Sequence, residues 1–324
     1  AAGNAASLLG AIARGGLQFM LVIWLAGIWL PLHGYDFTVT PLWAGIYMLP
    51  LTAGFLIAGP VSGTLSDRYG PRLFATSGLL LAAACFVGLM LLPVVFPYWL
   101  FALLIFGNGV GSGLFASPNT SAIMSAVPAR HRGSASGMRS TFQNSGMSLS
   151  IGIFFSLMIA GLASSLPRTL TRGLTAQGVP LSVATGVSHL PPVSTMFAAL
   201  LGYNPVQNLL TPSGVLSRLP AHNVAVLTGR QFFPNLISAP FHHGLIIVFT
   251  AAAIMAASGA MVSLLRGKQF YYDDTAAVSQ EPQKPMMPNG HARSASAGDS
   301  PVVAEDSRAV AGRDGAARRH GRGA

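Results

Sequence analysis

The sequence is poor in acidic residues. Between Phe37 and Tyr272 the only carboxylate is Asp67, and Asp and Glu together number 9 in 324 residues. Charged residues of both signs make up only 9% of the chain, and its mean hydropathy is +0.54. Because so few charges cannot cover the surface of a water-soluble protein of this length, the composition favours a membrane protein.

Cysteine and catalytic patterns are also scarce. The single cysteine, Cys85, falls in an apolar run, so we interpret it as a small packing residue. His242 and His243 are adjacent, and neighbouring side chains on a helix point in different directions, so interfacial anchoring explains them better than metal binding. The sequence shows no nucleophile with its base, no metal-ligand spacing and no phosphate loop. We therefore expect no enzyme, no metal site and no cofactor.

Six apolar segments are each long enough, at about 20 residues, to cross a hydrocarbon core. None carries a full charge in its middle, as the cost of about 2.5–3.5 kcal/mol for an ion at the bilayer centre requires. The sequence thus predicts an all-α polytopic membrane protein with six spans. The predicted spans are residues 16–33, 42–62, 73–95, 98–127, 138–163 and 243–265.

The arginines indicate how these spans are oriented. The short loops 34–41 and 96–97 contain no Lys or Arg, whereas the other short connections and both flanks do. By the positive-inside rule, we expect both ends of the chain in the cytoplasm. The cationic positions on that side are Arg14, Arg68, Arg72, Arg130, Arg132, Arg139, Arg266 and Lys268.

Two segments lie outside the spans. Residues 164–242 are too long for a bare connector, so we expect a small extracytoplasmic cap or interfacial helices there. Residues 266–324 are expected to form a cytoplasmic tail, disordered from about Asp273 on, where Ala, Gly, Ser, Pro and Arg predominate.

The net charge of +10 does not require a nucleic-acid partner. The basic residues are scattered over separate turns rather than gathered into one stripe with aromatics. Attraction to anionic headgroups of the inner leaflet is the simpler explanation, so the expected partner is the lipid bilayer.

The segment GTLSDRYGPR, residues 63–72, places its single acid in a cytoplasmic turn between the second and third spans. Gly63 permits close helix approach, and Gly70 followed by Pro71 ends one helix and begins the next. Asp67 and the neighbouring arginines favour either of two functions. They form a charged latch that is made in one conformation and broken in another, or a topogenic loop in which Asp67 only caps a helix.

This segment resembles the signature G-x-L-x-D-R-x-G-R-R of the major facilitator superfamily, with Pro71 in place of a basic residue. Residues 15–268 are similar to drug:proton antiporters of the fourteen-helix EmrB/QacA type. The stretches that carry this similarity include FGNGVGSGLFASPNTSAIMSAVP and FFPNLISAPFHHGLIIVF. The matching signature positions are Gly63, Leu65, Asp67, Arg68, Gly70 and Arg72.

The resemblance implies one six-helix bundle, the C-terminal half of a carrier in a bacterial inner membrane. It also implies that an N-terminal half supplies the proton-coupling carboxylates and the helix end that faces Asp67. The expected function is proton-coupled efflux of drugs or other amphipathic small molecules. The alternatives are a membrane interaction module that transports nothing alone, or a non-functional remnant.

Polar and aromatic residues within the spans are candidates for lining a substrate cavity. Buried amides are costly unless paired, so each amide either joins helices or faces substrate and water. Trp24 and Tyr47 either belong to an interfacial aromatic belt or stack on a flat cationic drug. The candidates are Gln18, Trp24, Tyr47, Asn108, Asn119, Gln143 and Asn144.

Overall fold

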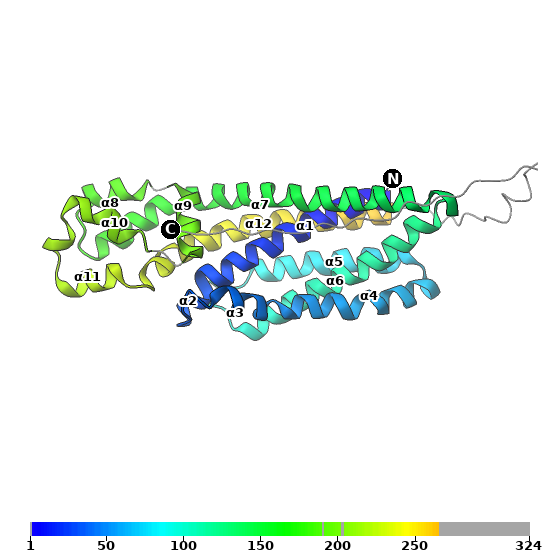
Figure 1. Cartoon of the computed structure of the whole chain (residues 1–324), viewed down its shortest axis with the longest axis horizontal. Coiled ribbons are helices and arrows are strands. Elements are labelled where there is room, and N and C mark those ends of the chain that lie inside the picture. The colour runs from blue at the N-terminus through cyan, green and yellow to red at the C-terminus, as the bar shows by residue number, and fades with distance from the viewer. Residues whose placement is uncertain (1, 190, 202–203, 266–324) are drawn as a thin grey trace, which may run out of the picture. The chain divides into compact units, whose positions relative to one another are not determined.

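The computed structural model describes residues 2–189, 191–201 and 204–265, which are predominantly helical (Figure 1). No strand occurs in these three ranges. They contain 6 helical runs that are long and apolar enough to cross a membrane. The predicted all-α, polytopic membrane fold is therefore confirmed, whereas the predicted tail, residues 266–324, lies outside the described residues.

Three of the six candidate spans are built from more than one piece, and the fifth of the six, Ala129–Ala176, joins the short helix η2 to α7. The first, Ala2–Leu32, joins α1, a π-helical turn η1 and α2, and the second, Thr40–Tyr69, joins α3 and α4. The main elements of the six spans are α1 (Ala2–Trp24), η1 (Leu25–Trp29), α2 (Leu30–Leu32), α3 (Thr40–Tyr47), α4 (Leu49–Tyr69), α5 (Pro71–Met90), α6 (Tyr98–Ser125), α7 (Arg132–Ala176) and α12 (Phe232–Leu264). The short helices are η2 (Ala129–His131), α8 (Leu181–Ser188), α9 (Pro192–Leu200), α10 (Val206–Leu210), η3 (Thr211–Ser213), η4 (Leu216–Arg218) and α11 (Ala221–Thr228).

The long helices form two sets of three. In one set α6 packs between α4 and α5, and in the other α1, α7 and α12 pack against one another (Figure 1). Contact between α5 and α12 joins the sets, whereas α1 and α6 touch only sparsely. The region between α1 and α6 is therefore the place where side chains of the two sets can leave space.

Small residues bring the helices of each set together. A Cβ added at Gly113 of α6 would lie 2.9 Å from the carbonyl oxygen of Phe55 in α4. One added at Gly111 would lie 2.6 Å from the carbonyl oxygen of Gly78 in α5. Because both approaches are to backbone, Gly111 and Gly113 of α6 act as helix-packing residues.

Burial differs strongly between spans. The most apolar window of Ala2–Leu32 is 72% buried, whereas that of Thr40–Tyr69 is only 22% buried. The exposed face of the latter carries large apolar side chains such as Leu42 and Leu56. A face of this composition suits lipid or another apolar helix surface.

Several helices extend beyond the apolar segments predicted as spans. The helix of the first span begins at Ala2 instead of residue 16, α7 continues to Ala176 instead of 163, and α12 begins at Phe232 instead of 243. Hydropathy detects only the part of a helix that suits hydrocarbon, whereas a helix also continues through small and hydroxylated residues. Residues 177–231 then contain α8 to α11, so short helices occur where a cap or interfacial helices are expected.

Candidate functional site

A cavity lies between the two helix sets. It is open to solvent, and the space free of protein atoms in it, open solvent included, amounts to about 630 Å³. Helices α1, α5, α6, α7 and α12 all contribute to the wall, and the apolar part includes Leu79, Phe86, Phe115 and Met147. The cavity therefore has the concave, largely apolar character of a small-molecule site.

Two arginines line this cavity, Arg14 from α1 and Arg139 from α7. The guanidinium carbon of Arg14 lies 5.2 Å from the centroid of the Phe55 ring. The Nε of Arg139 is buried and has no hydrogen-bond partner among the described residues. Within residues 2–265 the only carboxylates belong to Asp36 and Asp67, and neither lines the cavity.

Amides and hydroxyls add polarity beside these cations. Asn108 is buried and donates a hydrogen bond to the carbonyl of Ala82 at 3.4 Å. Gln143 lines the cavity one helical turn from Arg139, on the same face of α7. Ser7 also lines it, and its Oγ accepts a hydrogen bond from the side-chain amide of Asn119 at 2.7 Å. The lining of the cavity thus combines apolar side chains with positively charged and hydrogen-bonding ones.

The structure places the seven cavity candidates in four environments, of which the last is an aromatic cluster with Trp24 and Tyr47. Asn108 and Gln143 line the cavity, and Asn119 lies directly behind it through its bond to Ser7. Gln18 and Asn144 are exposed and do not line it. Asn108 and Asn119 also bond to neighbouring helices, so the helix-joining role expected of such amides occurs at both.

Trp24 and Tyr47 belong instead to an aromatic cluster at the opposite ends of these helices. Trp24 is only 1% exposed, and its ring centroid lies 4.8 Å from that of Phe96. The hydroxyls of Tyr47 and Tyr35 are 2.8 Å apart. Because neighbouring aromatic rings cover Trp24, it acts in packing, and the described structure leaves no face of it open for a ligand.

The adjacent histidines lie in α12. The ring centroid of His242 is 6.4 Å from that of Trp24, so this side chain reaches toward the aromatic cluster. Its Nδ1 is buried without a hydrogen-bond partner among the described residues. No group of three or more His, Cys, Asp or Glu side chains within these residues is placed to hold a metal ion.

The signature segment, residues 63–72, spans the end of α4 and the start of α5. Gly70 has a φ of 87°, in the left-handed region that favours glycine, and α5 begins at Pro71. The guanidinium of Arg72 donates to the carbonyl of Leu264 at the end of α12. Leu65, Asp67 and Arg68 are exposed, and no hydrogen bond joins Asp67 to another residue in the described ranges. The segment therefore connects two helices and contacts a third through Arg72.

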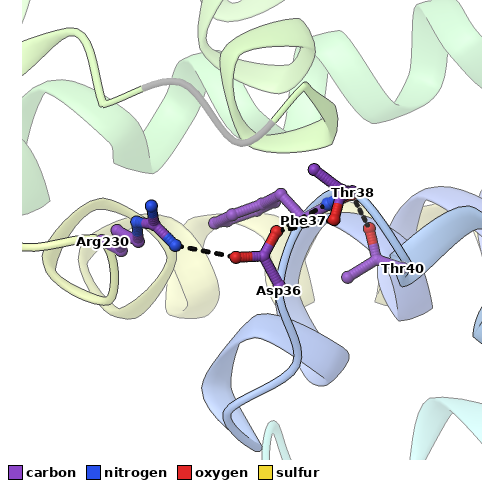
Figure 2. Close-up of polar contacts among 5 residues, drawn as sticks. All are labelled: Asp36, Phe37, Thr38, Thr40 and Arg230. Carbon is purple, nitrogen blue, oxygen red and sulfur yellow. Dashed lines mark hydrogen bonds and ion pairs between the residues drawn. The ribbon is translucent and has the colours of Figure 1, made fainter.

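At the opposite end of the bundle, an ion pair joins the loop between α2 and α3 to the start of α12 (Figure 2). The guanidinium of Arg230, just before α12, donates to the Asp36 carboxylate at 2.8 Å. The backbone N–H and the hydroxyl of Thr38 donate to the other carboxylate oxygen at 3.0 and 2.9 Å. The Thr38 backbone N–H, then the Thr38 hydroxyl and then Arg230 lower the pKa of Asp36.

Sequence reasoning did not identify Arg14 and Arg139 as cavity residues. It counted both as cytoplasmic cations, Arg14 ahead of the first predicted span and Arg139 at the start of the fifth, where the positive-inside rule explains them. The one signal that could have located Arg14 is its context, AIARGG, in which small residues on both sides allow the helix to start earlier and pack closely. Gly146 of α7 meets this same part of α1, since a Cβ added there would lie 3.0 Å from the Cβ of Ala11.

The fold and these contacts define a multi-pass helical membrane protein with a cavity between two helix sets. Residues 4–151 match the model of the Major Facilitator Superfamily. The chain is 37% identical over 145 residues to the methyl viologen resistance protein SmvA of Salmonella typhimurium, covering 44% of this chain and 28% of that protein.

Two further relatives are named for resistance or efflux. The chain is 25% identical over 267 residues to the tetracenomycin C resistance and export protein of Streptomyces glaucescens, covering 82% of this chain and 44% of that protein. It is 32% identical over 136 residues to the drug efflux pump JefA of Mycobacterium tuberculosis, covering 41% of this chain and 26% of that protein. Over residues 4–151 the chain is thus similar to the Major Facilitator Superfamily, and the relatives named here carry names of resistance or export. In each case the matched region spans less than half of the relative's length.

Proposed function

We propose that this chain forms the C-terminal half of a proton-coupled carrier of the EmrB/QacA type that exports drugs or other amphipathic small molecules. The observation that carries the proposal is the cavity between two three-helix sets, in a region that matches a transporter family. Relatives named for drug resistance and efflux support the same substrate class.

A second bundle is part of this proposal. The matched regions cover at most 44% of the relatives described above, which leaves room in those proteins for a further bundle. The exposed apolar face of α3 and α4 offers a surface for lipid or for helices of a partner. The coupling carboxylates are then assigned to the partner, because residues 2–265 hold only Asp36 and Asp67.

We assign the latch function to the signature segment. The exposed carboxylate of Asp67 is available to a helix end of the partner bundle, where the positive end of the helix dipole would stabilise it. Arg72 couples the same turn to the end of α12 through the Leu264 carbonyl. Binding of a partner helix end at Asp67 would therefore bias the positions of α4, α5 and α12 together.

The proposed location is a bacterial inner membrane with both chain ends in the cytoplasm. The signature segment and the arginines at the same end of the bundle then face the inner leaflet. The Asp36–Arg230 pair faces outward.

The test is efflux of a fluorescent amphipathic dye from proteoliposomes with an imposed pH gradient. We expect no gradient-dependent efflux from the chain alone and efflux when an N-terminal bundle is reconstituted with it. Asp67→Asn should reduce that efflux at least about tenfold while membrane insertion is unchanged. Asp36→Asn is the control, because it removes a carboxylate at the other end of the bundle. Efflux from the chain alone would refute the need for a second bundle, and full efflux by Asp67→Asn would refute the latch. If no combination transports, a non-transporting interaction module is the better description.

A further inference from the structure

The two cavity arginines are half-buried, and neither has a carboxylate beside it among the described residues. Transfer of an isolated charge out of water is costly, and side chains that remain charged inside a membrane protein pair with an opposite charge or face a polar cavity. Arg14 has an aromatic ring beside it, and Arg139 has a buried Nε without a partner among the described residues. Neither Asp36 nor Asp67 lines this cavity.

The rest of the wall indicates what would supply the missing negative charge. Leu79, Phe86 and Phe115 offer an apolar surface, so a small hydrated inorganic anion would leave most of the cavity unmatched. Gln143 adds a neutral hydrogen-bond donor on the same helix face as Arg139. A cationic ligand would meet two positive groups and no carboxylate, which disfavours it electrostatically.

We propose that this cavity binds an amphipathic anion, with a carboxylate, sulfonate or phosphate group at Arg14 and Arg139 and an apolar body against Leu79, Phe86 and Phe115. Arginine suits this task because its planar fork of donors matches the oxygens of such groups. The assignment gives a substrate class to the proposed exporter and rests on that function only for the export step. Binding itself is independent of transport.

Two kinds of molecule carry the acidic group and apolar body that this cavity would bind. The anion is either a soluble amphipathic molecule or the headgroup of an anionic lipid that enters through the open side of the cavity. Both place an acidic oxygen group at the arginines and an apolar body beside it. The experiment therefore includes an arm for each.

The probe pair is 8-anilinonaphthalene-1-sulfonate and N-phenyl-1-naphthylamine, which share a ring system and differ in the sulfonate. Fluorescence titrations use the full chain in phosphatidylcholine nanodiscs, with empty nanodiscs as the blank. We expect Arg14→Gln and Arg139→Gln each to weaken sulfonate binding about tenfold or more and to leave naphthylamine binding unchanged. Arg168→Gln and Arg172→Gln, exposed on α7 and away from the cavity, are the matched controls.

The lipid arm repeats the titration in nanodiscs that contain phosphatidylglycerol. If lipid headgroups fill the site, sulfonate binding to the unaltered chain falls, and phosphatidylglycerol retained in native mass spectra is lost in the two glutamine variants. If sulfonate binding persists, the ligand is a soluble anion. Either result supports the anion site.

Equal sulfonate binding by the unaltered chain and both glutamine variants would overturn the proposal, as would tighter binding of the cationic dye ethidium. Arg14→Lys and Arg139→Lys keep the charge but lose the planar fork of donors, so each should bind the sulfonate more tightly than the glutamine variant at the same position and less tightly than the unaltered chain. Export of cationic dyes by the reconstituted carrier, together with absent sulfonate binding, would leave the proposed function standing and remove only the anion site.

Discussion

Single side chains of the described bundle differ in whether a neighbouring group compensates their charge. At one end Asp36 accepts hydrogen bonds from Thr38 and forms an ion pair with Arg230. Further along the helices Arg14 and Arg139 line a cavity that no carboxylate of residues 2–265 reaches. The acid is satisfied locally, whereas the cavity cations remain available for a ligand.

The Asp36 carboxylate is expected to titrate below the ordinary range of aspartate. Its pKa is lowered by the Thr38 N–H, the Thr38 hydroxyl and Arg230, so the stabilisation from these contacts is present above the pKa of the unfolded chain. It is lost as the pH falls through the lower, folded-state pKa. Carbon-13 NMR of aspartate-labelled protein should show this pKa rising toward its usual value in Thr38→Val and in Arg230→Gln. An unchanged titration in both variants would contradict the hydrogen-bonded geometry.

At the scale of helices, glycine determines how closely α4 and α6 approach. A Cβ at Gly54 of α4 would lie 2.9 Å from the backbone nitrogen of Val110 in α6, and backbone cannot move aside as a flexible side chain can. Gly59, in the same helix, has nothing within 4 Å of an added Cβ. The two positions therefore form a natural comparison.

Gly54→Ala is expected to destabilise the bundle by about 1–3 kcal/mol, because overpacking separates α4 from α6. Gly59→Ala should be neutral or stabilise by about 0.5–1 kcal/mol, since alanine loses less backbone entropy in a helix. Thermal unfolding can be followed by the reaction of the buried thiol of Cys85 with a fluorogenic maleimide. Equal midpoints of thermal unfolding for Gly54→Ala and Gly59→Ala would show that α4 and α6 pack less closely than described.

The sequence predicts the six long apolar helices well, because about 20 consecutive apolar residues leave few alternatives to a membrane span. It predicts helix ends less well. Helix α7 continues beyond its apolar part, and there the hydroxyls of Thr169, Thr171 and Thr175 each bond to the carbonyl four residues earlier, so these polar side chains are satisfied within the helix. Among the cavity candidates, Asn108 and Gln143 could be anticipated as polar residues in spans. Arg14 could not, because its role depends on where α1 begins and on what α5, α6 and α7 place beside it.

At the scale of the whole molecule, the arrangement of charge predicts a topology. Alkaline phosphatase fused after the last residue should be inactive and a fluorescent protein there should fluoresce, because both ends are expected in the cytoplasm. Phosphatase inserted at Gly34, in the turn between α2 and α3, should be active. Active phosphatase at the carboxyl end would reverse the orientation and place the signature segment on the outer side.

The arginine-lined cavity has an electrical consequence. A resting bacterial membrane is negative inside, and one elementary charge moving through 100 mV exchanges about 2.3 kcal/mol. In the proposed orientation an anion carried outward releases this energy, and a proton carried inward in exchange releases it again. Such an exchanger moves two charges per cycle, so a potassium ionophore that abolishes the voltage should slow it even when the pH difference is kept. One-for-one exchange of a proton for a monovalent cation moves no net charge, and its rate would not respond in this way.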